Sequence, residues 1–511
     1  MYSNDSRTGM SSRNFTASIM GRLIGMFTSF VGRSIFVKVL SAEYLGLGGL
    51  FGNIFSVISL CELGFGAAIC QSLYKPLAEE NEYKVAAVVG YFTKVYRYVA
   101  FLTLMLGLFA LPILPAFAAG DIDMRVITAA YLLFLIHSTF SYLLAPKCNL
   151  VVCDQRMYVV TLTRSVLGVV ALVVQSVILV KTRNYILYLA ARIAVLTVED
   201  LIINFYADKK YPCLSLVRRV DREYKKSLYQ NVKALMFHKV GGVLSRSTDS
   251  LLLTYFVGLS GMGKYSNYAL VIGTVGAFFD VAVNAVAASV GNLGAKDRGQ
   301  KSERVMRKLY FMNFWLLTVG TCVIVSVLNP FIELWLGKNM LFSNTEMLII
   351  VASFYFSCIR DPVQIFVSTY GLYKQSRHIP IIRALLNLIL SVMFVGKMGV
   401  SGVFLGTVLS TVLSPLCSEV KVLYKYGFSR KPREFFVEMF GYIAKSFVCA
   451  ALCFLLTFGV KITPVGLVLR AVCAFCLSNA LLLVMSAHDG YLQDAVMTVK
   501  GVCRRLLKSK L

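Results

Sequence analysis

The sequence predicts an all-α polytopic membrane protein with about 14 transmembrane helices. Of its 511 residues, 57% are hydrophobic and only 15% are charged, and the mean hydropathy is +0.70. Soluble domains typically carry about 25% charged residues. Apolar runs of roughly 20 residues, the length that crosses a bilayer as a helix, recur from one end of the chain to the other. These runs leave no stretch long enough for a separate soluble domain.

The expected spans are separated by connections whose charge alternates. Their centres lie near residues 27, 58, 103, 136, 167, 193, 245, 276, 318, 354, 389, 406, 449 and 472. One set of connections is rich in Lys and Arg, as at 209–226, 296–308 and 421–433, whereas the intervening loops hold few cations. Because basic loops stay on the cytoplasmic side, we expect both termini in the cytoplasm. This topology accounts for much of the net charge of +26, so the charge does not indicate a nucleic-acid partner.

The second half of the chain repeats the layout of the first. The stretch from Asn14 can be laid on the stretch from Asn231, so that the turns LSAEYLG and LSGMGKYS coincide. Six helices per repeat is an even number, so both repeats enter the membrane from the same side, as parallel repeats in a pseudo-twofold arrangement. We expect a first six-helix lobe over 1–230, a second over 231–433, and two C-terminal helices with a basic tail over 434–511.

Known catalytic and metal-binding motifs are missing from the sequence. It contains no Walker A loop, no HExxH and no GxSxG nucleophile elbow. The CAFC stretch from Cys473 has CxxC spacing, but it lies in an apolar run without a neighbouring histidine, which favours helix packing over a metal or redox site. We expect a protein that is not an enzyme and has neither cofactor nor metal. Transport would then use an ion gradient, the membrane potential or consumption of the product.

The stretch from Glu43 to Asn81, EYLGLGGLFGNIFSVISLCELGFGAAICQSLYKPLAEEN, is the most distinctive part of the chain. It resembles the second-helix region of bacterial O-antigen and capsule repeat-unit translocases. These form the polysaccharide-transporter family of the multidrug/oligosaccharidyl-lipid/polysaccharide flippase superfamily. Six-plus-six repeats and a trailing helix pair extend the similarity in layout over nearly the whole chain.

The resemblance implies a two-lobed flippase of the bacterial inner (plasma) membrane that works by alternating access. Its substrate would be an oligosaccharide repeat unit, for O-antigen, capsule or exopolysaccharide, linked through pyrophosphate to a polyprenol. This substrate would move from the cytoplasmic to the outer leaflet. Related lipid II flippases carry an arginine in an SRVLG-like stretch of the first helix, where this chain has GRLIG, so the resemblance assigns Arg22 to the substrate. It also suggests membrane lipids, a polymerase and glycosyltransferases as partners. A lipid II flippase and a cation-coupled multidrug exporter are the alternatives.

Charged residues inside the expected spans are the candidate site, because such residues usually face a bundle interior or a wet cavity. Arginine offers a planar fork of donors that suits pyrophosphate oxygens. The predicted substrate-binding residues are Arg22, Arg33, Arg164, Arg192, Arg246 and Arg360. The predicted coupling or charge-pair residues are Glu62, Asp249, Asp280 and Asp361.

Several of these residues have two readings in the sequence. Arg246 and Asp249 stand three residues apart, so they could be a switchable pair in a cavity or could simply neutralise each other on one helix face. Arg360 precedes Asp361 and a proline, a pattern that fits a kink or a contact between lobes as well as substrate binding. Glu62 and Asp280 could carry protons, since desolvation raises a carboxyl pKa, or could balance neighbouring arginines.

Overall fold

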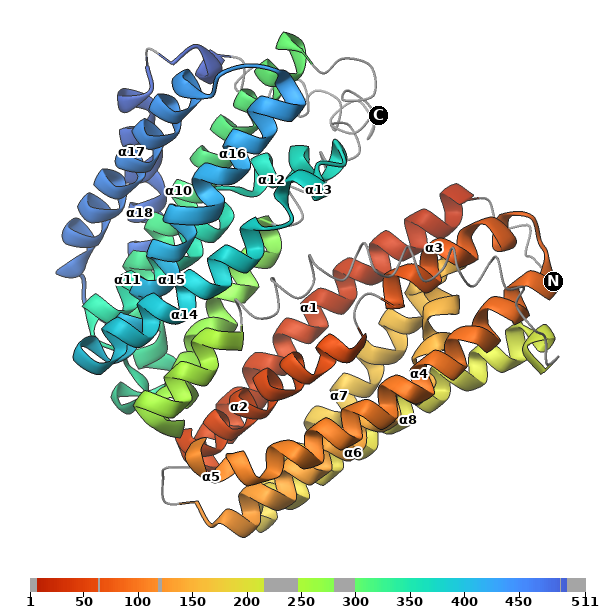
Figure 1. The fold of residues 1–511 in the computed structure, drawn as a ribbon. Coiled ribbons are helices and arrows are strands. Elements are labelled where there is room, and N and C mark those ends of the chain that lie inside the picture. The colour runs from red at the N-terminus through yellow and green to blue at the C-terminus, as the bar shows by residue number, and fades with distance from the viewer. Residues whose placement is uncertain are drawn as a thin grey trace, which may run out of the picture. The chain divides into compact units, whose positions relative to one another are not determined.

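The computed structural model describes residues 7–62, 65–117, 122–215, 247–279, 299–487 and 489–493. The chain divides into two compact units, Met1–Gly263 and Lys264–Leu511, each of which is described by itself. All regular elements in the described residues are helical (Figure 1). The predicted lobe boundary at 230 falls outside the described residues and stays a prediction.

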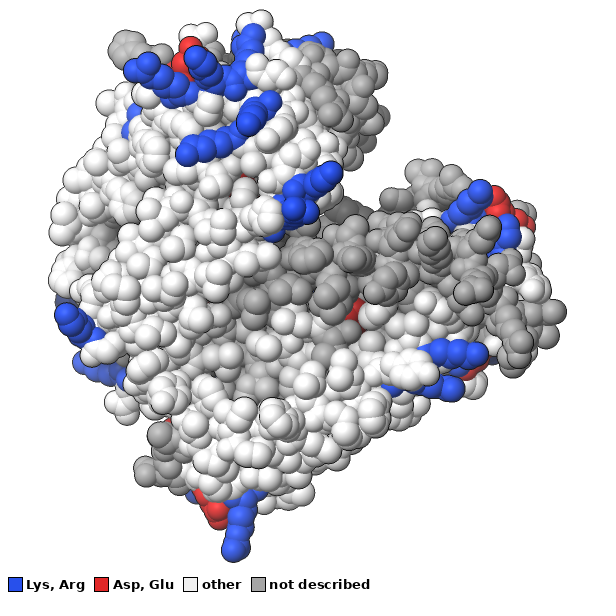
Figure 2. Space-filling view, viewed as in Figure 1, with Lys and Arg blue, Asp and Glu red and all other residues white. Residues whose placement is uncertain are grey.

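The described residues include nine helical segments long and apolar enough to cross a membrane. Their flanks expose large aliphatic side chains, such as Val166 at 62% and Val468 at 64%, which suits a surface covered by lipid. Lys and Arg instead gather at the ends of each unit, as the blue side chains of Figure 2 show. The prediction of a polytopic all-α membrane protein is confirmed.

Unit 1 is built from long helices that pack side by side. They are α1 (Arg7–Val39), α2 (Ala42–Ile58), α3 (Phe65–Ala78), α4 (Glu82–Ala110), the short α5 (Leu114–Phe117), α6 (Met124–Cys153), α7 (Met157–Thr182) and α8 (Tyr185–Lys210). Helix α1 packs on α7, α7 on α8, α8 on α6, and α6 on α4. Asn81, Asp123 and Asn184 cap three of these helices, because each side chain accepts a hydrogen bond from a backbone N–H of the first turn.

The span predicted around residue 58 is broken near its middle. Helix α2 ends at Ile58, a 3₁₀ turn over Ser59–Glu62 follows, and α3 begins at Phe65. Backbone that leaves the α-helix at membrane depth is tolerated where it is buried in protein or lines a cavity, because lipid offers no hydrogen-bond partners. The break places the carboxylate of Glu62 at the end of a half-helix.

The two turns aligned by the sequence repeat lie against each other within unit 1. Helix α1 gives way to α2 at Leu40 and Ser41, and Gly258, within the helical residues 247–279, has a φ of +86°. A Cβ atom at Gly46 would overlap the carbonyl of Leu259, and one at Gly263 would overlap the carbonyl of Ala42. Glycine is therefore needed at this crossing, as in other close helix contacts in membranes.

Unit 2 contains the remaining helices. They are α10 (Gln300–Leu336), α11 (Asn344–Cys358), α12 (Asp361–Thr369), α13 (Tyr373–Ser376), α14 (Ile379–Met398), α15 (Val400–Thr411), α16 (Cys417–Val422), α17 (Arg433–Phe458) and α18 (Pro464–Met485), with π-helical turns over Val412–Leu416 and Leu423–Phe428. Helix α10 is the centre of this unit, because α11, α12, α17 and α18 all pack on it.

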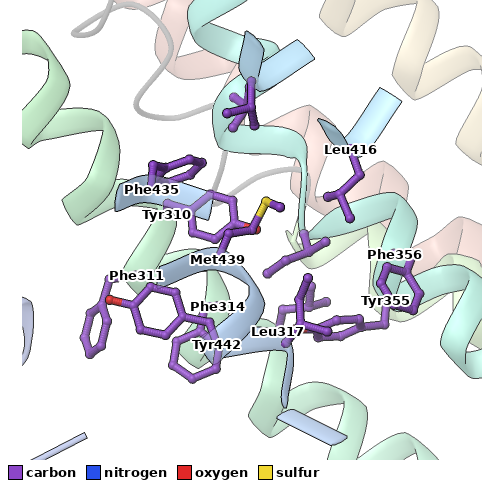
Figure 3. Packing of buried hydrophobic residues seen from close by; sticks show 14 of the residues in the cluster. Tyr310, Phe311, Phe314, Leu317, Tyr355, Phe356, Leu416, Phe435, Met439 and Tyr442 are labelled. Carbon is purple, nitrogen blue, oxygen red and sulfur yellow. The ribbon is translucent and has the colours of Figure 1, made fainter. Parts of the chain in front are cut away.

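The core of unit 2 is rich in aromatic residues that α10 contributes. Tyr310, Phe311 and Phe314 are at most 1% exposed, and Phe314 stacks on Tyr442 of α17 at 4.6 Å between ring centroids (Figure 3). A buried hydroxyl chain continues this contact, since Tyr355 of α11 donates to Ser446 of α17 at 2.8 Å. Rings and hydroxyls together hold α17 against α10 and α11.

Candidate functional site

Most of the predicted site residues lie in the described part of the chain, on unit 1. Arg246 and Asp280 fall outside the described residues, so their predicted roles stay predictions. Asp249 lies in the helical residues 247–279 and is half-buried. The structure places the remaining predicted arginines of unit 1 on three helices that pack together: α1, α7 and α8.

A first level of charge joins α1, α7 and α8. Gly21 contacts α7, because a Cβ there would lie 3.1 Å from the Ser165 hydroxyl, so the adjacent residues Arg22 and Arg164 have similar depths. Both arginines are exposed. Arg164 donates from Nε to Oε1 of the buried Glu199 on α8 at 2.8 Å. Glu199 therefore holds Arg164 while leaving more than half of its side chain accessible.

A second level lies further along the same helices. The guanidinium of Arg33 on α1 interacts electrostatically with Arg192 and Tyr188 on α8. Eleven residues separate Arg22 from Arg33, which corresponds to about 16 Å along the helix axis. Two cations from different helices are thus close enough to influence each other electrostatically. Unit 1 thus presents cations at two depths.

His137 on α6 lies near charged groups of α8. Its imidazole interacts with Asp200 and with Arg192, both on α8. The Nδ1 atom is buried and has no hydrogen-bond partner among the described residues.

Glu62 stands in a separate polar cluster at the break between α2 and α3. Its Oε1 accepts a hydrogen bond from the hydroxyl of Tyr96 on α4 at 2.9 Å. Tyr96 also bonds to Asn149 of α6, and Gly66 gives the carboxylate room, since a Cβ there would lie 3.1 Å from Oε1. The partners that the described residues offer Glu62 in this cluster are neutral, and its predicted role stays a prediction.

Arg360 is engaged in a buried ion pair on unit 2. It lies between α11 and α12, where the chain leaves the helix at Ile359 and Arg360, as the proline at 362 allows. Its Nε donates to Oε2 of Glu419 at 3.1 Å and its Nη2 donates to Oε1 at 2.8 Å. Both side chains are about nine-tenths buried, at 11% and 9% exposure. This geometry fits the kink reading better than substrate binding. Asp361 begins α12 and is half-buried.

The sequence reasoning missed three charged residues that the structure shows in specific contacts: Glu199, Glu419 and Arg470. Arg470 of α18 is 6% exposed and donates to carbonyls of Ser326, Phe458 and Val460. Pro330 has no N–H to donate to the Ser326 carbonyl. The Phe458 carbonyl ends α17 and the Val460 carbonyl lies just beyond it, so Arg470 satisfies groups that the helices leave open. The position of Arg470 inside an apolar run of the sequence could have identified it as a candidate.

Comparison of the sequence with family models gives no match, and comparison with curated proteins gives none either. Solved structures do match the fold. The lipid II flippase MurJ in an inward closed conformation has a TM-score of 0.66 at 13% identity, covering 93% of this chain and 99% of that one. A multidrug resistance MATE transporter of the MOP superfamily, facing inward, has a TM-score of 0.59 at 13% identity, covering 78% and 94%. The fold of this chain is therefore similar to the folds of these transporters.

A further solved structure also matches the fold. The MATE transporter VcmN of Vibrio cholerae, with a TM-score of 0.53 at 17% identity, covers 82% of this chain and 98% of its own. These identities are low, so the likeness concerns the arrangement of helices. The comparison therefore shows the fold alone.

Proposed function

We propose that this protein is a flippase that moves polyprenyl-pyrophosphate-linked oligosaccharide repeat units from the cytoplasmic to the outer leaflet of a bacterial inner membrane. The observation that supports the proposal is the pair of cationic levels on unit 1, Arg22 with Arg164 and Arg33 with Arg192. The cycle would be alternating access, driven by an ion gradient or the membrane potential. The polysaccharide-transporter family is the branch of the superfamily that this proposal selects.

Pyrophosphate suits the two levels because each of its anionic oxygens can accept a charge-assisted hydrogen bond from a guanidinium. Glu199 neutralises part of the first level, whereas the second level holds two cations in electrostatic contact. An anion entering the first level would therefore be attracted onward to the second. A step of about 16 Å between levels lets the headgroup cross much of the hydrocarbon core without facing bare lipid.

The sign of these charges also separates the proposal from a multidrug exporter. A cationic, aromatic cargo would be repelled by Arg33 and Arg192 and would call for carboxylates instead. A lipid II flippase carries the same pyrophosphate, so it remains the second candidate, and the fold match to MurJ favours it. The sugar distinguishes these two functions, and the cationic levels do not.

The proposal is tested by reconstituting the protein in proteoliposomes with a fluorescent polyprenyl-pyrophosphate oligosaccharide whose outer-leaflet pool is quenched by dithionite. Wild-type protein should expose the inner pool to quenching within minutes. Arg33→Ala and Arg192→Ala should each slow this flipping about tenfold or more, because each removes a charge-assisted contact. Arg97→Ala is the matched control, since Arg97 is an exposed arginine of α4 outside both levels.

Three outcomes would contradict the proposal. Equal loss with Arg97→Ala would mean that positive charge matters only for topology. Faster flipping of lipid II than of the oligosaccharide lipid would select the second candidate. Extrusion of a cationic dye with no flipping of either lipid would select the multidrug exporter.

A further inference from the structure

The start of α17 forms a shallow surface hollow that the transport site does not use. The hollow has a volume of about 670 Å³ and is lined by Lys431, Pro432, Arg433, Phe436, Val437 and Phe440. The exposed cations Lys431 and Arg433 thus lie at the start of α17, next to three apolar side chains of that helix. This order of charge and apolar surface is that of a lipid molecule at a membrane interface.

The two cations of the hollow are available to a ligand. Lys431 and Arg433 are both exposed, and neither forms a hydrogen bond or ion pair with any described residue. The neighbouring Arg430, by contrast, is bound to Glu303 at 3.0 Å. Pro432 precedes α17 without a side-chain cap, so the first amides of this 26-residue helix add positive potential at the same place.

Nearby carboxylates do not cancel this charge. Glu434 and Glu438 of α17 point about 100° or more around the helix from Arg433, as their spacing requires. Both are engaged by Arg307 of α10, at 3.3 Å and 2.9 Å. The hollow therefore keeps its own cations and faces away from the acidic side of the helix.

The apolar part of the hollow continues along the same face of α17. Val437 is 72% exposed and Phe440 is 47% exposed, and Phe447 follows them two turns later at 48%. From Arg433 to Phe447 the helix rises by about 21 Å, which is roughly the depth of one leaflet with its headgroups. Phe447 also lines a second apolar slot of about 330 Å³ between α11 and α17. Exposed apolar side chains suited to acyl chains thus occur along this face of α17.

We propose that this hollow binds an anionic glycerophospholipid of the leaflet at which α17 begins, the cytoplasmic leaflet on the predicted topology. The phosphate lies between Lys431 and Arg433, and the acyl chains lie along Phe436, Val437 and Phe440. This inference is independent of the proposed cargo, because it concerns a resident lipid on the outer flank of unit 2. Bound there, the lipid anchors the cytoplasmic end of α17 at the membrane interface.

The test measures lipids that remain bound to the purified full-length protein by native mass spectrometry. Protein is released from micelles containing equal amounts of phosphatidylglycerol and phosphatidylcholine. We expect preferential retention of phosphatidylglycerol by wild type, and a fall of about tenfold in Lys431→Gln/Arg433→Gln, since each interfacial cation contributes to anionic-lipid binding. Lys461→Gln is the matched control, because Lys461 is exposed at the opposite end of α17.

Three results would overturn the proposal. Unchanged phosphatidylglycerol retention in the double variant would show that the two cations do not bind it. Equal retention of phosphatidylcholine would remove the requirement for an anionic headgroup. Displacement of phosphatidylglycerol by equimolar geranylgeranyl pyrophosphate, with the same dependence on Lys431 and Arg433, would assign the hollow to the cargo headgroup instead. The substituted residues are exposed, so folding is not expected to change.

Discussion

The ion pair of Arg360 and Glu419 gives the sharpest prediction, because it separates a structural arginine from a substrate-binding one. Both side chains are about nine-tenths buried and are joined by two hydrogen bonds, so little water is present to screen a charge left behind. Glu419→Ala should therefore destabilise the protein by about 3–5 kcal/mol, the usual cost of an uncompensated buried charge. Replacing both residues, as in Arg360→Met/Glu419→Leu, should restore most of that loss, since neither charge then remains to be desolvated.

The measurement is the free energy of unfolding in mixed micelles for wild type, both single variants and the double variant. A double-mutant cycle isolates the coupling between the two residues, which should exceed about 2 kcal/mol for contacting groups of this kind. Flipping by the double variant in proteoliposomes should stay near the wild-type rate. A stable double variant that no longer flips its lipid would refute the reasoning and return Arg360 to the substrate site. Wild-type stability in Glu419→Ala would show that the pair is not buried as described.

Three further predictions concern Arg470, Gly46 and the topology at Lys461. Arg470→Leu should lower the free energy of unfolding by about 1–3 kcal/mol, because it leaves buried carbonyls without a donor. Combining it with Pro330→Ala should reduce that loss, because the new backbone N–H can donate to one of these carbonyls. An equal loss from Arg470→Leu with and without Pro330→Ala would contradict the assignment. Gly46→Val should impair folding or membrane insertion, measured as the yield of monodisperse protein, whereas Gly48→Val should not, because a Cβ at Gly48 meets no atom within 4 Å. A cysteine introduced at Lys461, in a background free of other cysteines, should react with an impermeant thiol reagent outside intact cells; labelling only after permeabilisation would invert the predicted topology.

The sequence alone was sufficient for the class of protein and the helical fold. These are local properties: a run of about 20 apolar residues is long enough to span a bilayer wherever it occurs. The sequence therefore also shows which ionisable residues lie within such a run. Solved structures of a flippase and of multidrug transporters match this fold, as the sequence resemblance led us to expect.

The partner of each charge was decided by the tertiary structure. Arg164 meets Glu199 across 35 positions, and Arg360 meets Glu419 across 59, so neither pairing leaves a sign in the local pattern. Which helices pack, and which faces they present, depends on the whole unit. The break at Glu62 was also not predicted, because the sequence indicates a single span centred near residue 58. In the structure, Glu62 at this break accepts a hydrogen bond from Tyr96. The sequence thus shows that a charge lies within an apolar run. Helix packing determines whether that charge pairs with a group on another helix or is accessible to a ligand.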